Sequence, residues 1–195
     1  MDTPRRACDR MAPMSAETPA EPTAAADATL VEAQVRAALT ATGGAFDIIP
    51  CDPALADTAE FCAAYGYSPD ISANTIIAIG KGATPVYVAC IVLATTRLDV
   101  NGALRKRLEV RKASFAAAED TMAITGMQIG GVTPFALPHT LPIWIDAEVT
   151  RRAQLILGGG SRSIKVLCPP ATLLALPNAV VVEGLALATP QAERP

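Results

Sequence analysis

Apolar positions in the first half of the chain recur first at helical and then at strand spacing. The stretch LVEAQVRAALTATG carries its leucines and valines at helical intervals and ends at Gly43-Gly44, which predicts a first helix. AFDIIP predicts a short strand, and ALADTAEFCAAYG predicts a second helix closed by its terminal glycine. In ANTIIAIGKGATPVYVACIVLA, two β-branched runs are joined by Gly80-Lys81-Gly82, which predicts an antiparallel hairpin with Lys81 in its turn.

The second half alternates short apolar runs with residues that end them. Asp99 or Asn101 can cap a helix through Leu104 and Leu108, VRKASF predicts a short strand, and AAAEDTMAITG predicts a helix that ends at Gly126. LPIWID, AQLILGGG, SIKVLCPP and AVVVEG are further short strands, while LCPPATLLAL begins a helix at its prolines. Because several strands are adjacent and few βαβ repeats occur, we predict an α+β fold: a single domain with a mixed or antiparallel sheet and flanking helices.

The two ends of the chain differ from its middle. Residues 1–28 are rich in Ala, Pro, Thr and Glu with almost no large apolar side chains, so they cannot bury enough surface to offset the entropy of ordering. We predict a disordered tail over 1–28, one domain over 29–187 and a short C-terminal tail over 188–195. A chain of 195 residues is long enough for one well-buried domain.

Composition narrows the class of protein. Hydrophobic residues make up 51% of the chain and charged residues 18%, which is typical of a soluble α/β-type composition. No apolar run approaches the roughly 18 residues that cross a bilayer, and the N-terminus lacks the apolar centre of a secretory signal. We therefore expect a cytoplasmic protein without a membrane partner. The net charge of -3 argues against a surface built as a whole for nucleic acid, and DNA is not an expected partner.

Basic residues nevertheless gather in the segment RLDVNGALRKRLEVRK, where only Asp99 and Glu109 oppose them. Such a run is either a solvated helix face or a surface that meets phosphates. The basic residues of the segment are Arg97, Arg105, Lys106, Arg107, Arg111 and Lys112.

Candidate metal and nucleotide sites are weak. Five cysteines lack CxxC spacing and His139 is the one histidine, which leaves too few ligands for zinc, so we expect neither metal nor cofactor. His139 follows Pro138 in a polar turn, where an exposed loop position is a better prediction than a general base. The turn GGGSR, residues 158–162, lacks the Lys-Ser/Thr ending of a P-loop, so nucleotide hydrolysis is not expected.

The stretch GGVTPF, residues 130–135, lies between a predicted helix and an apolar run. It can be a stiff turn, because glycine reaches positive φ and proline fixes its own φ. It can also be a ligand cradle, because glycines let bare N–H groups approach an anion or a carbonyl. The local sequence leaves both interpretations open.

The order of these features is similar to that of the YbaK and prolyl-tRNA synthetase associated domain family, editing domains that hydrolyse mischarged aminoacyl-tRNA. The resemblance runs from about residue 31 to about residue 185, and its most specific element is GGVTPF, within MQIGGVTPFALP, which matches the family's glycine-to-proline substrate loop. The other matching pieces, in the same order, are YGYSPDISANTIIAI, VYVACIVLA, RLDVNGALRKRL, LPIWID and ILGGGSRS.

The resemblance implies a trans-editing deacylase that cleaves the ester between a wrong small amino acid, such as Ala, Cys or Ser, and the terminal ribose of tRNA. Water would attack the carbonyl carbon, and main-chain N–H groups of Gly130 and Gly131 would stabilise the oxyanion by roughly 3 to 4 kcal/mol each. Many members carry a lysine at the position of Asn74, whereas asparagine is only a neutral donor and acceptor. Asn74 either orients a water or the α-amino group, or caps the turn before the strand.

The local sequence leaves the roles of two other residues open. Thr133 bonds either the substrate or its own loop, and Trp144 is core or a pocket wall. Two alternatives remain: a module that lost the family lysine and binds tRNA or a small acyl ligand without hydrolysis, and a hydrolase of another small ester or thioester. The oligomeric state is not indicated. The implied substrate-binding residues are Val132, Thr133, Pro134 and Phe135, and the implied tRNA-binding residues are Arg97, Arg105, Lys106, Arg107, Lys112, Arg162 and Lys165.

Overall fold

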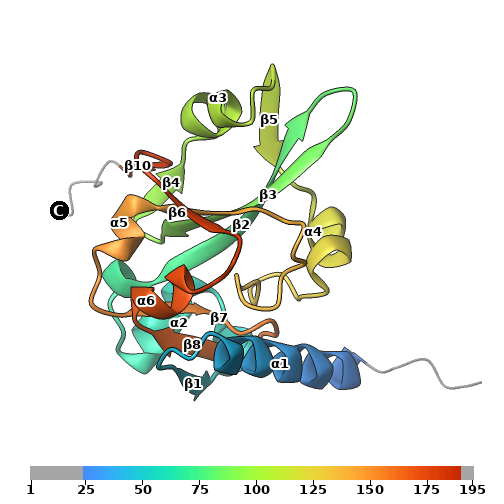
Figure 1. Cartoon of the computed structure of the whole chain (residues 1–195). Helices are drawn as coiled ribbons and strands as arrows, with labels where there is room; N and C mark the ends of the chain where they lie inside the picture. The colour runs from blue at the N-terminus through green and yellow to red at the C-terminus, as the bar shows by residue number, and fades with distance from the viewer. Residues whose placement is uncertain (1–23, 190–195) are drawn as a thin grey trace, which may run out of the picture.

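A five-stranded mixed sheet in the order β5-β2-β3-β6-β9 forms the centre of the protein, whose computed structural model describes residues 24–189 (Figure 1). β2 pairs antiparallel with both β3 and β5, whereas β3, β6 and β9 run parallel to one another. This mixed sheet confirms the predicted α+β class. Its strands are β5 (Lys112–Phe115), β2 (Ala73–Lys81), β3 (Val86–Leu93), β6 (Ile143–Asp146) and β9 (Ala179–Val182).

A second, three-stranded antiparallel sheet lies beside the first, in the order β1-β8-β7. A single parallel bridge between Ser72 and Ile156 joins the beginning of β2 to β7. A two-stranded antiparallel ribbon completes the strands with β4 (Thr96–Leu98) and β10 (Ala186–Ala188). The strands of the second sheet are β1 (Asp47–Pro50), β8 (Ile164–Cys168) and β7 (Leu155–Gly158).

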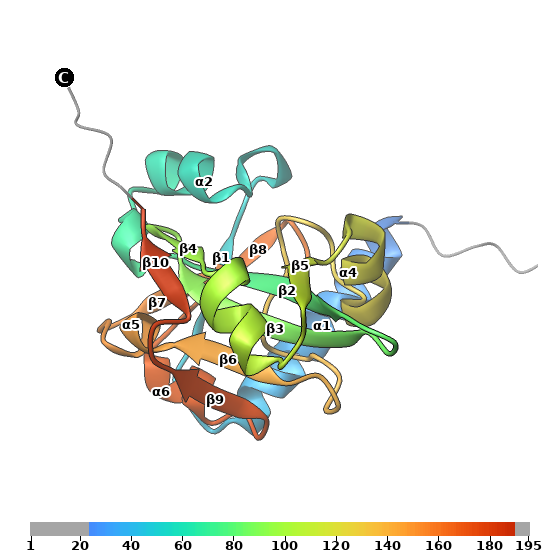
Figure 2. The same cartoon turned by 90° about the horizontal axis from the view of Figure 1, so that it is seen from above.

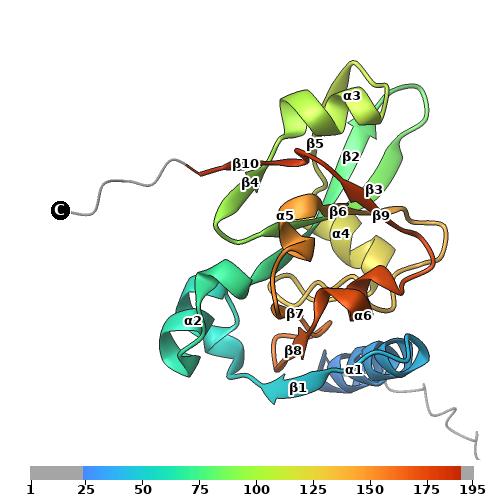
Figure 3. The same ribbon diagram turned by 60° about the vertical axis from the view of Figure 1, so that its left-hand side comes forward.

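Helices cover both faces of the central sheet. α1 and α3 lie on opposite faces (Figures 1 and 2), and α2 stands to one side next to the three-stranded sheet (Figure 3). A π-helical turn, Val100–Leu104, leads directly into α3, and short 3-10 turns occupy Pro53–Leu55 and Pro69–Ile71. The helices are α1 (Ala24–Ala41), α2 (Thr58–Tyr65), α3 (Arg105–Arg107), α4 (Ala118–Thr125), α5 (Ala147–Thr150) and α6 (Pro170–Leu174).

The alternation of side chains along β2 and β3 divides the core in two. Ile77 and Ile91 point to one face, where they join Val35 of α1 and the apolar side of the three-stranded sheet. Ala78 and Val92 point to the other face and pack with residues of the segment before α3 and of the β4–β10 ribbon. A third cluster around Phe61 of α2 packs against Ile156 of β7, and it forms one wall of the site described below.

Several boundaries differ from the prediction. α1 begins at Ala24, so residues 24–28 are helical rather than part of a disordered tail; residues 1–23 and 190–195 lie outside the described part. Lys81 is the last residue of β2 and not a turn residue, because Gly80 pairs with both Val86 and Ala113 inside the sheet. The elements β4, α5 and β10 were not predicted.

Candidate functional site

A cavity of about 340 Å³ opens where β2 separates from β7. The two strands touch at the Ser72–Ile156 bridge, and β2 pairs with β5 only from Ala78 onward. The edge of β2 between these points has no strand beside it, and the cavity occupies this gap. Its walls are Ala56, Asp57, Thr58, Phe61, residues 72–77, Phe115, Ala116, Thr121, Ile129, Gly130, Val132, residues 156–158 and Lys165.

Lys165 of β8 places a cation in the wall of this cavity. The residue is 6% exposed, and its Nζ donates hydrogen bonds to the carbonyls of Ala56 and, at 3.2 Å, Gly130. The ammonium also lies 5.6 Å from the centroid of the Phe61 ring. Burial lowers the pKa of Lys165, while the nearby Cys51 raises it to a smaller extent. These contacts place Lys165 inside the cavity wall, so the predicted contact of Lys165 with tRNA could be made only by a group that enters the cavity.

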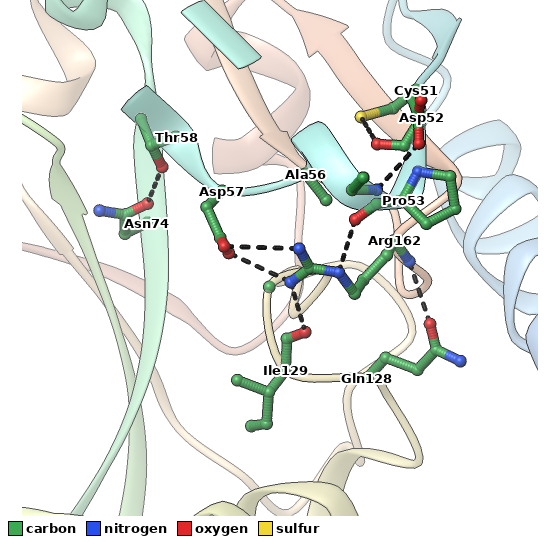
Figure 4. Close-up of polar contacts among 12 residues, drawn as sticks. Cys51, Asp52, Pro53, Ala56, Asp57, Thr58, Asn74, Gln128, Ile129 and Arg162 are labelled. Atoms are coloured by element: carbon green, nitrogen blue, oxygen red, sulfur yellow. Dashed lines mark hydrogen bonds and ion pairs between the residues drawn. The ribbon is translucent and has the colours of Figure 1, made fainter. Parts of the chain in front are cut away.

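Asn74 lines the same cavity from β2, as the family resemblance predicts for a site residue. Its Oδ1 accepts a hydrogen bond of 3.1 Å from Thr58 Oγ1 at the beginning of α2 (Figure 4). This partner comes from another element, and not from the turn before β2 that a capping role would involve. The amide nitrogen of Asn74 has no hydrogen-bond partner among the described residues, so it remains available as a donor.

The two glycines of the GGVTPF loop have different roles. Gly130 lines the cavity with φ of 87°, and its carbonyl accepts from Lys165. Gly131 donates its N–H to Gln128 at 2.9 Å, and its carbonyl accepts from Gly160 at 2.7 Å. A Cβ at Gly131 would stand 2.1 Å from the carbonyl oxygen of Ser161, so the glycine permits close approach of two main chains. The expectation of two ligand-facing N–H groups is therefore corrected for Gly131.

The rest of the loop faces away from the cavity after Val132, which lines it. Phe135 is fully buried in the larger core cluster, and Pro134 lines a second cavity on the α1 side. Thr133 is fully buried, with its hydroxyl unpaired among the described residues, and its N–H points at the sulfur of Met127. The structure thus brings Val132 to the site but not Thr133, Pro134 or Phe135.

Arg162 and Asp57 form an ion pair at the edge of the cavity, with Nη1 and Oδ1 3.1 Å apart (Figure 4). The guanidinium also donates to the carbonyls of Pro53, at 2.9 Å, and Ile129, at 3.4 Å. The hydrogen bond from Arg162 lowers the pKa of Asp57. Because these partners occupy the guanidinium, Arg162 is a link between segments rather than a free phosphate ligand, and sequence reasoning missed Asp57.

The basic segment lies apart from the cavity and contributes none of its lining residues. Arg97 lies on β4, Arg105 to Arg107 form α3, and Lys112 begins β5. Arg107 stands 5.1 Å from the ring centroid of Trp144, and Arg105 donates to the carbonyl of Asn101 at 2.8 Å. Every basic residue of this segment except Arg105 is exposed, Lys106 and Lys112 among them, so the segment can meet a polyanion.

Other candidate chemistry is weak in the described part of the chain. Burial raises the pKa of Cys90 and of Cys168 to about 12, so both thiols stay protonated and unreactive. Among residues 24–189, no group of three His, Cys, Asp or Glu residues is arranged to hold a metal ion, and no helix is both long and apolar enough to span a bilayer. His139 is exposed, as predicted, beside the second cavity of about 670 Å³, which Pro134 also lines.

Comparison with solved structures identifies the fold. A structure described as a candidate trans-editing enzyme for prolyl-tRNA synthetase superposes with a TM-score of 0.68 at 23% identity, covering 78% of this chain and 95% of the other. The protein APE2540 gives a TM-score of 0.71 at 23% identity, with 79% and 99% covered. Among curated proteins, none matches the chain.

The family itself follows from the sequence match. A family model described as the aminoacyl-tRNA editing domain matches residues 52–176. This range is more than half of the chain, and it contains every residue that lines the cavity beside β2. The chain therefore belongs to the aminoacyl-tRNA editing domain family, in agreement with the resemblance that its motifs indicated.

Proposed function

We propose that the protein is an aminoacyl-tRNA deacylase that hydrolyses the ester of a mischarged tRNA in the cavity beside β2. The observation that carries the proposal is the meeting of Asn74, Gly130 and Lys165 around one cavity inside the editing-domain match. Such a reaction belongs in the cytoplasm, where tRNA is charged.

The chemistry needs little beyond positioning, because an aminoacyl ester is already activated. A water molecule attacks the ester carbonyl carbon, and Asn74 orients that water or the α-amino group through its amide nitrogen. The N–H of Gly130 is the donor of the GGVTPF loop that we assign to the carbonyl oxygen, whereas the N–H of Gly131 is engaged by Gln128. Val132 contacts the side chain of the amino acid, while Thr133, Pro134 and Phe135 hold the loop in place.

The size of the cavity favours a small amino acid. Its volume of about 340 Å³ is near the lower end of the roughly 300 to 1,000 Å³ found for ligand sites. Alanine, cysteine and serine esters leave room for the terminal ribose and a water, whereas larger side chains would meet Phe61 and Ile156. The exposed lysines near α3 would hold the tRNA backbone outside the cavity.

The test is deacylation of tRNA charged with alanine, cysteine or serine by the full-length protein, with correctly charged tRNA as the control. We expect at least one of the three esters to be cleaved well above its spontaneous rate. Asn74→Ala should slow that cleavage without unfolding the protein, because its lost partner, Thr58 Oγ1, can bond water at the partly buried site. Folded protein with no activity above buffer on any mischarged tRNA contradicts the proposal.

A second function is favoured by one observation, the neutral Asn74 in place of the family's usual lysine. The protein would then bind tRNA or a small acyl ligand without cleaving it. Tight, salt-dependent tRNA binding without turnover supports this alternative. A hydrolase of another small ester or thioester would instead cleave free esters at rates unchanged when Arg105, Lys106 and Arg107 are neutralised.

A further inference from the structure

We propose that Lys165 supplies the cation of this site, donating a hydrogen bond from Nζ to the carbonyl oxygen of the scissile ester. The proposal deepens the proposed deacylase function and rests on it. It assigns to β8 the charge that the family resemblance places at the position of Asn74.

The contacts of Lys165 leave one donor for a ligand. A lysine ammonium has three N–H donors, and two are used by the carbonyls of Ala56 and Gly130. These carbonyls come from different walls of the cavity, so they fix the position of Nζ between them. Lys165 itself lines the cavity, and the third N–H is the one that a bound carbonyl oxygen can accept.

The charge of Lys165 is not neutralised by a carboxylate. Among residues 24–189 it forms no ion pair, and Asp57, the carboxylate that raises its pKa, is held by Arg162. A buried cation without an anionic partner is costly unless a ligand uses it. A purely structural link between two carbonyls does not need a full charge, and an amide or hydroxyl would serve it.

Lys165 also supplies the positive charge that β2 lacks at Asn74. Asn74 offers a neutral amide, and Lys81 is exposed at the far end of β2, outside the cavity lining. Asn74 and Lys165 line the same cavity, with the segment Ala56–Thr58 bonded to both of them. A positive charge is therefore restored to the cavity from a different strand.

The step that this charge assists is the addition of water. The water oxygen forms a bond to the carbonyl carbon, and the electron pair of the C=O π bond moves to the carbonyl oxygen, opposite Lys165 Nζ. That pair then reforms the C=O bond as the bond to the ribose oxygen breaks. The ribose oxygen takes up the proton that the water gives up, which leaves a free amino acid and tRNA with a free hydroxyl. Lys165 stays protonated throughout.

The pH dependence follows from the surroundings of Nζ. Burial lowers the pKa of Lys165, and the positive charge of Arg162 lowers it further. The nearby Cys51, Asp57 and Cys62 each raise it to a smaller extent than burial lowers it. The ammonium is thus lost at a lower pH than that of an exposed lysine. If the protonated form is required, activity falls as pH rises through the lowered pKa.

The test compares Lys165→Met, which removes the charge at similar length, with Lys165→Arg, which keeps it. Lys81→Met is the control, because it changes an exposed lysine outside the site. Each full-length variant is checked by circular dichroism and assayed on the mischarged tRNA that the wild type cleaves fastest, with spontaneous hydrolysis subtracted. We expect kcat to fall about 100-fold or more for Lys165→Met with little change in KM, and no change for Lys81→Met.

The outcomes separate this proposal from the function on which it rests. An inactive wild type removes the deacylase function, whereas an active wild type with an equally active, folded Lys165→Met removes only the role of Lys165. If Lys165→Met does not fold, pH profiles decide. We expect the fall in kcat/KM at alkaline pH to move to higher pH in Lys165→Arg than in the wild type. An identical fall in the two proteins overturns the proposal, because it would then come from titration of the substrate, which is the same in both assays.

Discussion

Arg162 joins three segments that border the cavity. Its guanidinium donates to the carboxylate of Asp57, before α2, and to the carbonyls of Pro53 and Ile129 (Figure 4). A planar guanidinium has enough donors in fixed directions for all three, whereas a lysine ammonium at the end of a flexible stem does not. The ion pair is partly exposed, with the Asp57 side chain 62% accessible. We therefore expect Arg162 to stabilise this edge mainly through its hydrogen bonds to the main chain.

Two variants separate these contributions. Asp57→Asn removes the charge of the ion pair and keeps the main-chain bonds, so we expect a loss of less than about 1 kcal/mol of unfolding free energy. Arg162→Ala also leaves the two carbonyls without this donor, and the expected loss is about 1 to 3 kcal/mol. Urea denaturation measures both. Equal losses for the two variants would mean that the ion pair, and not the link to the main chain, is what stabilises this edge.

Gly131 distinguishes a structural from a ligand-binding role for the GGVTPF loop. Gly131→Ala puts a Cβ 2.1 Å from a carbonyl oxygen of Ser161, so we expect a loss of more than about 3 kcal/mol in stability. Gly82→Ala is the control, because its Cβ would have no atom nearer than 3.7 Å, and we expect a change within about 0.5 kcal/mol. Thermal and urea unfolding measure both. A Gly131→Ala variant that is fully stable but inactive would show that Gly131 has a ligand-binding role and not a structural one.

Elements that depend on neighbouring residues were predicted from the sequence, and those that depend on distant residues were not. The β2–β3 hairpin and the helix ends at Gly66 and Gly126 follow from local periodicity and from glycine in the left-handed region. The β4–β10 ribbon pairs residues about 90 positions apart, and three-residue strands have no periodicity to detect. The position of Lys165 in the cavity could not be predicted for the same reason, because it depends on the register of β8 against β1 and on where α2 lies.

The π-helical turn before α3 offers a test at the level of one element. Asp99 accepts from the N–H groups of Gly102, at 3.0 Å, and Ala103, at 2.9 Å, whereas Asn101, the other predicted cap, is exposed within the turn. We expect Asp99→Ala to cost about 1 kcal/mol, and Asn101→Ala to cost only a few tenths. Chemical denaturation of both variants gives the comparison. A larger effect at Asn101 would place the cap two residues later than the structure does.

At the scale of the whole molecule, the residues of the basic segment lie apart from the cavity beside β2. The chain as a whole is acidic, with a net charge of -3, yet basic residues gather on α3 and at the beginning of β5, away from the cavity lining. A tRNA whose acceptor end enters the cavity would extend over the outside of the domain. If tRNA is bound by the basic segment and cleaved in the cavity, substitutions in the first region should change the affinity for tRNA and substitutions in the second should change turnover.

Neutralising the exposed basic residues therefore tests binding alone. Lys106→Gln with Lys112→Gln removes two exposed charges that have no ion pair among the described residues, and leaves Arg107 stacked on Trp144. Each lost phosphate contact should lower the slope of log affinity against log salt concentration by about 0.9. We expect weaker tRNA binding, a slope smaller by about 1 to 2, and unchanged turnover at saturating tRNA. The control, Arg36→Gln with Arg151→Gln, alters the net charge equally at exposed sites outside the basic segment, so an equal effect on the salt slope would show that tRNA responds to overall charge and not to α3 and β5.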